Sequence, residues 1–462
     1  MNESSVGKRS SRREFLGGAA VAAAGLIVVP RRILGGEGQA APSSTLNVAK
    51  IGVGGMGGGD LNAVVGCGAN IVALCDVDEN TLNGAAKRFP KAKTYFDFRK
   101  MFDEMEKEID AAVVSTADVS HAVASMWAVK RNKHCYTQKP LTRTVKEARL
   151  LTEAARKHGV ATQMGNQGHS GGGLPATAEY LRAGAIGTVT EAHTWSDRPK
   201  GWWPQGVAAP TYSDPVPKHL HWDLWLGPMP ERPFIASWRD GQFKGKHVYH
   251  PHNWRGWWDF GAGAMGDMAC HNMDPAFWCL DLGAPTSVKA TCSEFNHVIF
   301  PTWSVIEWEF PAKGDRPAVK LFWHDGGKQP PRPEELEKDR RMDSNGCMFV
   351  GDKGKMMGGG WAGFCRIVPE AKMKEFPAPP KTLPRSPHGH YKDWVEAAKG
   401  AKVVPGSNFE YSGPMTEAIL LGNVALWYPG EKLLWDAEKL AFTNKPEANK
   451  LLHYECRKGW EL

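Results

Sequence analysis

The feature that most constrains the fold is a glycine-rich segment that follows a short apolar run. Residues 46–51 have strand character, and Gly52, Gly54 and Gly57 come next at the spacing G-x-G-x-x-G. Between a strand and a helix, such glycines allow a tight turn, close approach of a pyrophosphate to the backbone, and close helix packing. The pattern predicts a dinucleotide-binding loop, with a flexible surface loop as the alternative. The loop residues predicted to bind the cofactor are Gly52, Gly54, Gly55, Met56 and Gly57.

An acidic residue closes the second apolar run, residues 71–75. Asp76 stands nineteen positions after Gly57, where this kind of fold places the carboxylate that binds the adenosine ribose hydroxyls. A carboxylate there would repel a 2′-phosphate, so we predict NAD as the cofactor in preference to NADP.

Short apolar strands and helical segments alternate through the next part of the chain. Residues 111–116, 134–137 and 160–164 read as strands, and the segments between them read as helices. This order predicts a doubly wound parallel sheet, an α/β Rossmann domain over residues 45–166. Ligands of such sheets bind outside the carboxyl ends of the strands. The residues predicted to lie in that crevice are Thr116, Asp118, His121, Gln138 and Lys139. For Lys139, a solvated surface charge is the alternative.

The remaining chain, residues 167–462, is predicted to form an α/β domain with an open, mostly antiparallel sheet. Over residues 195–258, here called the Trp-rich insertion, the composition shifts towards Trp, Pro, Gly and His. Indole faces pack on sugar rings, and long loop-rich insertions are often functional, whereas a second core among loops is the alternative. The residues predicted to bind substrate are Asn166, His169, Trp254, Arg255 and Trp257.

Two polar residues stand one helical turn apart after Gly266. If this stretch is a helix, Asp267 and His271 share a face at i and i+4. A carboxylate next to an imidazole can hold its tautomer and raise its basicity, as a general base requires. The alternative is that Asp267 caps the helix and His271 is a hydrogen-bonded core residue.

The N-terminus predicts export. Residues 11–16, Ser-Arg-Arg-Glu-Phe-Leu, match the twin-arginine signal, and the apolar stretch 19–29 is too short to span a bilayer stably. We therefore expect residues 1–41 to be a signal and linker, and the protein to be periplasmic or otherwise extracytoplasmic. It would contact the membrane only through an uncleaved signal. A basic tail before a chance apolar run is the alternative.

Composition adds few constraints. The net charge of +7 is modest and lies partly in the first 32 residues, so it gives no reason to expect a nucleic-acid partner. The nine cysteines are scattered without metal-ligand spacing, and we expect most of them to be buried, reduced thiols. His247, His250 and His252 have no acid or cysteine at the spacing of a metal site, so we expect hydrogen-bonding roles for them and no metal.

Four matches in order resemble the glucose–fructose oxidoreductase, inositol dehydrogenase and rhizopine-catabolism family, written Gfo/Idh/MocA, over about residues 45–445. They are G-V-G-G-M-G at 52–57, Asp76, Lys139-Pro140, and Asp267-x-x-x-His271. The resemblance implies a Rossmann domain followed by an α/β domain whose open sheet face holds substrate or a neighbouring subunit, and thus a dimer or tetramer.

The resemblance also implies catalytic roles. Lys139 would hydrogen-bond the reacting hydroxyl, His271 would take its proton, and Asp267 would orient the substrate or the imidazole. Hydride would pass to the nicotinamide of NAD. The family commonly has Glu before the Lys-Pro pair, whereas here Gln138 removes a charge beside Lys139. This departure leaves the route of the proton open.

Export and cofactor together constrain the function. An exported enzyme leaves the NAD pool behind, so we expect a tightly held cofactor that is regenerated in the same site. The leading prediction is an NAD-dependent oxidoreductase acting on a sugar, glycoside or cyclitol hydroxyl. The alternatives are an NAD-dependent glycoside hydrolase, acting by transient oxidation, elimination and hydride return, and a non-catalytic carbohydrate-binding protein.

Overall fold

Parallel pairing of the N-terminal apolar runs builds the first sheet. In the computed structural model, which describes residues 45–462, its strand order is β3-β2-β1-β4-β5-β6, and every neighbouring pair is parallel. The strands are β1 (Asn47–Ile51), β2 (Asn70–Cys75), β3 (Lys93–Tyr95), β4 (Ala111–Val114), β5 (His134–Thr137) and β6 (Thr162–Met164). This order confirms the predicted doubly wound sheet. The predicted export signal lies outside the described residues.

Helices cover both faces of this sheet, as near-continuous apolar strands require. They are α2 (Met56–Gly66), α3 (Glu79–Arg88), α4 (Phe98–Met105), α5 (Asp118–Lys130) and α6 (Val145–His158). Local sequence sets their ends. For example, α6 begins with a capping box formed by Thr144 and Glu147, and it ends at Gly159 in the left-handed conformation.

The second sheet is mixed. Its order is β13-β12-β11-β7-β10-β9-β8-β14-β15, and all pairs are antiparallel except β7 with β10. The strands are β7 (Val189–Trp195), β8 (Ser287–Cys292), β9 (Ser304–Phe310), β10 (Val319–His324), β11 (Gly346–Gly351), β12 (Gly354–Gly359), β13 (Arg366–Val368), β14 (Lys432–Asp436) and β15 (Ala441–Phe442). Burial alternates along β9, so one face is packed and the other is partly open.

The remaining helices pack on or between the sheets. They are α7 (Gly173–Arg182), α8 (Trp222–Leu226), α9 (Gly263–Asn272), α10 (Asp274–Cys279), α11 (Glu370–Glu375), α12 (His390–Ala398) and α13 (Phe409–Ala425). Short 3-10 turns span Gln167–Ser170, Gly241–Phe243, Asn253–Gly256 and Pro446–Leu451. Between residues 45 and 462, no helix is both long and apolar enough to cross a membrane.

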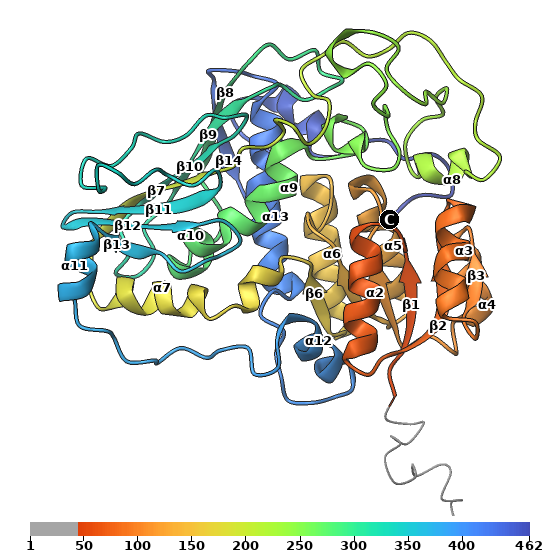
Figure 1. Ribbon diagram of the computed structural model, residues 1–462, viewed down its shortest axis with the longest axis horizontal. Helices are drawn as coiled ribbons and strands as arrows, with labels where there is room; N and C mark the ends of the chain where they lie inside the picture. The colour runs from red at the N-terminus through yellow and green to blue at the C-terminus, as the bar shows by residue number, and fades with distance from the viewer. Residues whose placement is uncertain (1–44) are drawn as a thin grey trace, which may run out of the picture. The chain divides into compact units, whose positions relative to one another are not determined.

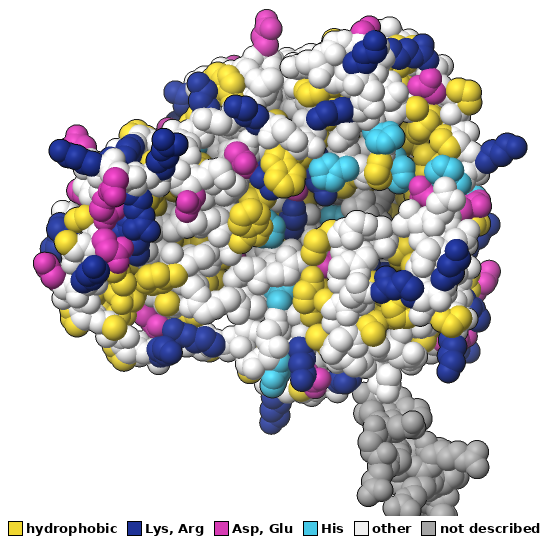
Figure 2. Space-filling view, in the orientation of Figure 1, with side chains coloured by type: hydrophobic (Ala, Val, Ile, Leu, Met, Phe, Trp, Pro, Cys, Tyr) yellow, Lys and Arg dark blue, Asp and Glu magenta, His cyan; other side chains and the backbone are white. Residues whose placement is uncertain are grey.

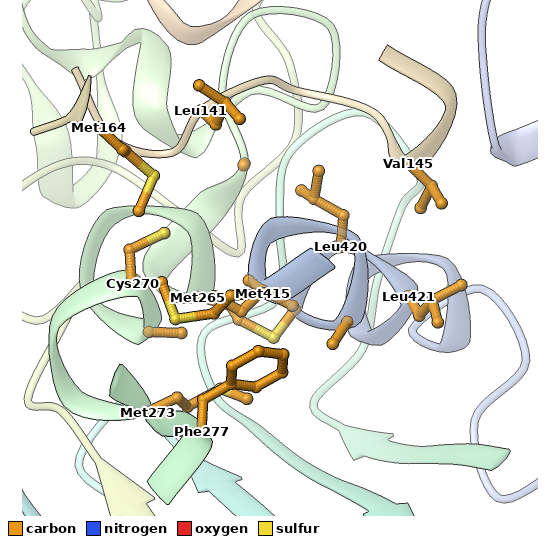
Figure 3. Close-up of a cluster of buried hydrophobic side chains, with 14 of the residues drawn as sticks. Leu141, Val145, Met164, Met265, Cys270, Met273, Phe277, Met415, Leu420 and Leu421 are labelled. Carbon is orange, nitrogen blue, oxygen red and sulfur yellow. The ribbon is translucent and has the colours of Figure 1, made fainter. Parts of the chain in front are cut away.

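The core that joins the two sheets surrounds α13. This helix packs against α6 of the first sheet, against α9, and against β8 and β9 of the second sheet (Figure 1). Figure 3 shows its side chains, including Met415, Leu420 and Leu421, beside Met265 of α9 and Phe277 of α10. Closely packed protein interiors do not deform easily, so this core holds α9 at a fixed position relative to β5.

The Trp-rich insertion folds as loops with their own core above the carboxyl edge of the first sheet (Figure 1). Apart from Trp195, which ends β7, its buried aromatic residues are Trp203, Trp222, Trp225, Phe234, Trp238, Tyr249, Trp254 and Trp257. The insertion is bonded to the loop after β2, where the Glu79 amide donates to the His219 carbonyl at 2.8 Å and the His221 amide to the Val77 carbonyl at 2.9 Å. Most of the indoles are therefore core residues, as the alternative interpretation held.

Candidate active site

The glycine-rich loop has the geometry that a dinucleotide diphosphate needs. A Cβ atom on Gly52 would lie 2.3 Å from the Ser115 carbonyl oxygen, and one on Gly57 would lie 2.2 Å from the Gly52 carbonyl oxygen. Only glycine permits this packing of the loop on β4 and of α2 on β1. Gly55, at φ 50°, precedes α2 with open space around it and no side-chain cap. The first amides of α2 are thus left for an anion, and these residues fit NAD.

Asp76 is fixed beside this loop. One carboxylate oxygen accepts the Val53 amide at 2.8 Å and the other accepts the Asp78 amide at 3.0 Å. Burial raises the pKa of Asp76, and these two backbone donors oppose that shift. Each oxygen keeps a lone pair, so the carboxylate can still accept a hydrogen bond from the adenosine ribose, and this contact stays a prediction.

Gln138 faces a buried acid that the sequence did not single out. Its amide nitrogen lies 2.9 and 3.0 Å from the two carboxylate oxygens of Asp60 on α2. Asp60 also accepts the Ser115 hydroxyl at 2.6 Å and the Tyr391 hydroxyl at 2.7 Å. A glutamate at position 138 would place two carboxylates in contact. Gln138, in place of the family's Glu, can therefore donate to Asp60, while the amine of Lys139 is bonded to Asp267.

We expect Gln138→Glu to lower the free energy of unfolding by about 1–3 kcal/mol at pH 8, because two buried carboxylates would lose a hydrogen bond and repel. The introduced acid would have a raised pKa, so stability should return as the pH falls towards 5. Adding Asp60→Asn, whose amide can donate to the introduced carboxylate, should restore stability at pH 8. Urea unfolding of the single and double variants measures this, and equal loss in both would contradict the pairing.

His121 connects the loops after β4 and β5. Its ring nitrogens lie 2.7 Å from the Pro140 carbonyl oxygen and 3.1 Å from the Thr116 carbonyl oxygen. Burial lowers the pKa of His121 to about 4, so the ring is neutral. A neutral ring has one N–H and can donate to only one of these carbonyls. His121 nevertheless lies between the two loops, and its predicted contact with the cofactor stays a prediction. Thr116 lies in the same loop and its hydroxyl donates to the Ala117 carbonyl.

Lys139 and Asp267 form a buried ion pair between β5 and α9. The Lys139 amine donates to the Asp267 carboxylate at 2.7 Å and to the Asp267 carbonyl at 2.8 Å. Arg255 donates to the same carboxylate at 3.3 Å, and the Nε atom of Arg198 lies 3.7 Å from its other oxygen. Burial alone would raise the pKa of Asp267, but the charges of Lys139 and Arg255 hold it below its ordinary value. Three cations around one anion favour an alkoxide that develops nearby.

His271 lies one turn along α9 from Asp267 but is not bonded to it. Its side chain is 4% exposed, and its Nδ1 atom has no hydrogen-bond partner within residues 45–462. The Asp267 carboxylate accepts hydrogen bonds from Lys139 and Arg255 instead, so the predicted carboxylate–imidazole pair is wrong. The capping alternative is also wrong, because α9 begins at Gly263. Burial and the charge of Lys139 lower the pKa of His271 to about 3. A neutral imidazole with an unused nitrogen can accept a proton.

Asp118 lies at the base of this cluster. Its carboxylate accepts the Ala262 amide at 3.0 Å, which ties the start of α5 to the segment leading into α9. Burial raises the pKa of Asp118 to about 7, against the opposing charges of Arg255 and Lys139. Asp118 therefore has a pKa close to neutral pH, unlike His271 and His121.

The predicted substrate residues divide into three groups. Arg255 belongs to the charged cluster. Asn166 and His169 bond instead to Asp274, at 3.3 and 2.9 Å, and the Oδ1 atom of Asn166 lacks a partner within the described chain. Trp254 and Trp257 are only 7% and 2% exposed and pack in the core of the insertion, which corrects the prediction that they contact substrate.

Sequence reasoning did not assign three residues beside the cluster to the site. Arg198 follows β7 and lies under the ring of Trp202, with 3.4 Å between its guanidinium carbon and the ring centroid. The ring of Trp361 lies 6.3 Å from that of His271. On the face of the molecule drawn in Figure 2, hydrophobic, basic and histidine side chains lie side by side around a hollow. For Trp361 the available signal was its place in the glycine-rich run 351–363. Trp202 belongs to the Trp-rich insertion, whose indoles were predicted either to bind sugar or to form a core, and Arg198 had no signal.

An ordinary histidine base would make kcat/KM fall as the pH drops through about 6.5. We expect no such fall between pH 8 and pH 5, because His271 stays neutral down to about pH 3. Steady-state rates of the wild type and of Asp118→Asn, measured across that range, check this. A loss near pH 6–7 that persists in Asp118→Asn would contradict a neutral His271, and one that disappears would belong to Asp118.

Two family models match the chain. Residues 46–166 match the model of an oxidoreductase family described as an NAD-binding Rossmann fold. Residues 200–316 match the model of the C-terminal alpha/beta domain of the same oxidoreductase family. The two matches are consecutive and fall on the first sheet and on the part of the chain that includes α9.

Curated relatives are similar to this chain over part of its length. An inositol 2-dehydrogenase from Salmonella typhimurium is 24% identical over 153 residues, which are 32% of this chain and 45% of the relative. A D-apiose dehydrogenase from Paraburkholderia graminis is 31% identical over 121 residues, 26% of this chain and 32% of the relative. The chain thus spans less than half the length of these curated relatives.

A solved structure extends the likeness of fold over most of the chain. The WlbA dehydrogenase from Bordetella pertussis, solved in complex with NADH and UDP-GlcNAcA, superposes with a TM-score of 0.57 at 16% identity. The match covers 85% of this chain and 99% of that one. At this identity the likeness concerns the fold, a Rossmann domain followed by a second α/β domain.

Proposed function

Because the chain belongs to the Gfo/Idh/MocA oxidoreductase family, we propose that it is an NAD-dependent enzyme that oxidises a hydroxyl group of a sugar, glycoside or cyclitol. The observation that carries this proposal is the buried Lys139–Asp267 pair, at 2.7 Å, one helical turn from a neutral His271. Dehydrogenases of inositol and D-apiose among the relatives support this class of substrate.

The proposed mechanism assigns one task to each side chain. A lysine amine has three donor hydrogens, and Asp267 takes two of those of Lys139. The third is free to donate to the reacting hydroxyl oxygen and to stabilise the alkoxide. The Nε2 atom of His271, which is not enclosed as Nδ1 is, accepts the hydroxyl proton, while Asp267 holds the amine and Arg255 holds Asp267. NAD, when bound in the glycine-rich loop, supplies the hydride acceptor.

We expect Lys139→Met to lower kcat about 100-fold or more, because the developing alkoxide loses its charged donor. The control is Lys130→Met, an exposed lysine on α5, which should keep the wild-type rate. NADH formation against a panel of sugars and cyclitols measures this, and circular dichroism verifies the fold. Near-native turnover of Lys139→Met would rule out the assigned role.

We further propose that the protein is exported through a twin-arginine signal in residues 1–41, works outside the cytoplasm as a dimer or tetramer, and retains its NAD between turnovers. The bonds between the Trp-rich insertion and the loop after β2 support retention. Asp78 both caps α3 and lies 3.0 Å from the Nε2 atom of His250. The insertion is therefore anchored two residues from Asp76, at the edge where the adenosine ribose is predicted to bind.

The nucleotide content of the exported protein tests retention. After gel filtration without added cofactor and then denaturation, we expect about one NAD(H) per chain, because a nanomolar complex survives dilution. His250→Ala should lower that content by weakening the anchor, whereas His247→Ala, at an exposed position of the same insertion, should not. A wild-type protein that emerges empty would overturn retention. Free sugar released from glycosides without net NADH would instead indicate the hydrolase alternative.

A further inference from the structure

We propose that Trp202 and Trp361 form a two-indole binding site and that the substrate is a glycoside of at least two rings. Trp361 would stack on the ring whose hydroxyl meets Lys139 and His271, and Trp202 would stack on the neighbouring ring. The inference rests on the proposed function of the same site and narrows its substrate class from any sugar or cyclitol to a ring-linked glycoside.

The exposure of these two indoles sets them apart. The chain has 19 tryptophans, and within residues 45–462 only Trp202, at 48%, and Trp361, at 49%, are largely exposed. Single exposed apolar residues are common on protein surfaces. Here, however, both exposed indoles border the same buried charged cluster, although they come from segments far apart in the chain.

The backbone of Trp361 is held in place at a conformational cost. Trp361 and Ala362 have φ angles of 58° and 54°, a left-handed conformation that is unfavourable for residues with a Cβ atom. The Trp361 amide donates to the Asn272 side chain at 3.1 Å, and the Ala362 amide donates to the His271 carbonyl at 3.2 Å. Both bonds join this loop to the end of α9. The indole is thereby fixed 6.3 Å from the His271 ring with half of its surface open.

Trp202 is fixed by a different contact. Its ring lies on the guanidinium of Arg198, with 3.4 Å between the guanidinium carbon and the ring centroid, a strong cation–π geometry. Arg198 is buried, and its Nε atom, which has no hydrogen-bond partner within the described residues, lies 3.7 Å from the Asp267 carboxylate. One face of the indole is therefore held against the charged cluster, and about half of its surface remains open to a ligand.

The two indoles contact different parts of the site. Trp202 packs on Arg198, whose Nε atom faces Asp267, whereas Trp361 lies beside His271, about 5 Å further along α9. We therefore assign a separate ring to each indole. The C–H faces of sugar rings pack on indoles, while the hydroxyl edges of the same rings can accept hydrogen bonds from Lys139 and Arg255.

The test compares disaccharides with their component monosaccharides, on NAD-loaded protein. Maltose, cellobiose and lactose are titrated calorimetrically against glucose and galactose, using Lys139→Met so that binding is read without turnover. We expect at least one disaccharide to bind more tightly than its monosaccharides. Trp202→Ala should weaken that disaccharide about three- to tenfold and leave the monosaccharides unchanged, whereas Trp361→Ala should weaken both. Trp202→Phe and Trp361→Phe should restore most of the affinity.

Phe364→Ala is the matched control. Phe364 directly follows the glycine-rich run 351–363 and is 37% exposed, but its ring centroid lies 5.5 Å from that of Tyr180 of α7, so its loss should change neither affinity. Equal effects of Trp202→Ala on both sugar classes, or no preference for any disaccharide, would overturn the two-ring inference. If disaccharides bind as expected but the wild type forms no NADH with any sugar, the proposed oxidoreductase function fails while the two-indole site stands.

Discussion

The arrangement of the site depends on the buried ion pair between Lys139 and Asp267. Lys139 follows β5 of the first sheet, and Asp267 lies on α9 beneath the second, so the 2.7 Å contact joins the two halves of the site. Removing two charges from water is costly unless they are paired and further hydrogen-bonded. The pair meets that condition with Arg255 and with the carbonyl of Asp267 itself. The main effect of the pair is therefore to position the Lys139 amine, and its contribution to stability is smaller. It keeps a charged donor beside the neutral imidazole of His271.

The packed segments around the Lys139–Asp267 pair hold its two side chains in a fixed geometry. The core around α13 joins α6 to α9, and the neutral ring of His121 lies between the carbonyl groups of Pro140 and Thr116, in the loops after β5 and β4. Asp60 and Gln138 link the start of α2 to the loop after β5. The glycine-rich loop, the lysine and the α9 residues are thus connected through packed and hydrogen-bonded groups. A site built in this way is preorganised, which is what electrostatic stabilisation of an alkoxide requires.

The first sheet was predictable from the sequence because local signals and fold agree there. Apolar runs, the glycine spacing and Asp76 at a strand end each follow from short-range geometry, and α6 carries its own capping box. The Trp-rich insertion was harder to predict, since an indole on a loop is equally consistent with a core and with a ligand site. Periodicity also failed for Asp267 and His271. It correctly placed them on one helix. It could not show that Lys139, Arg255 and Arg198, which lie outside that helix, would surround the Asp267 carboxylate.

The sequence by itself determined the parallel nucleotide-binding sheet, the identity of its loop, and the residue types that reach its edge. These depend on spacings within a few turns or strands of one another, which the chain order preserves. Only the tertiary structure decided which partners those residues have: Asp60 for Gln138, Asp267 for Lys139, the backbone for His121, and open space for Trp202 and Trp361. The first two of these pairings join residues 78 and 128 positions apart. They arise from packing, which no local pattern in the sequence records.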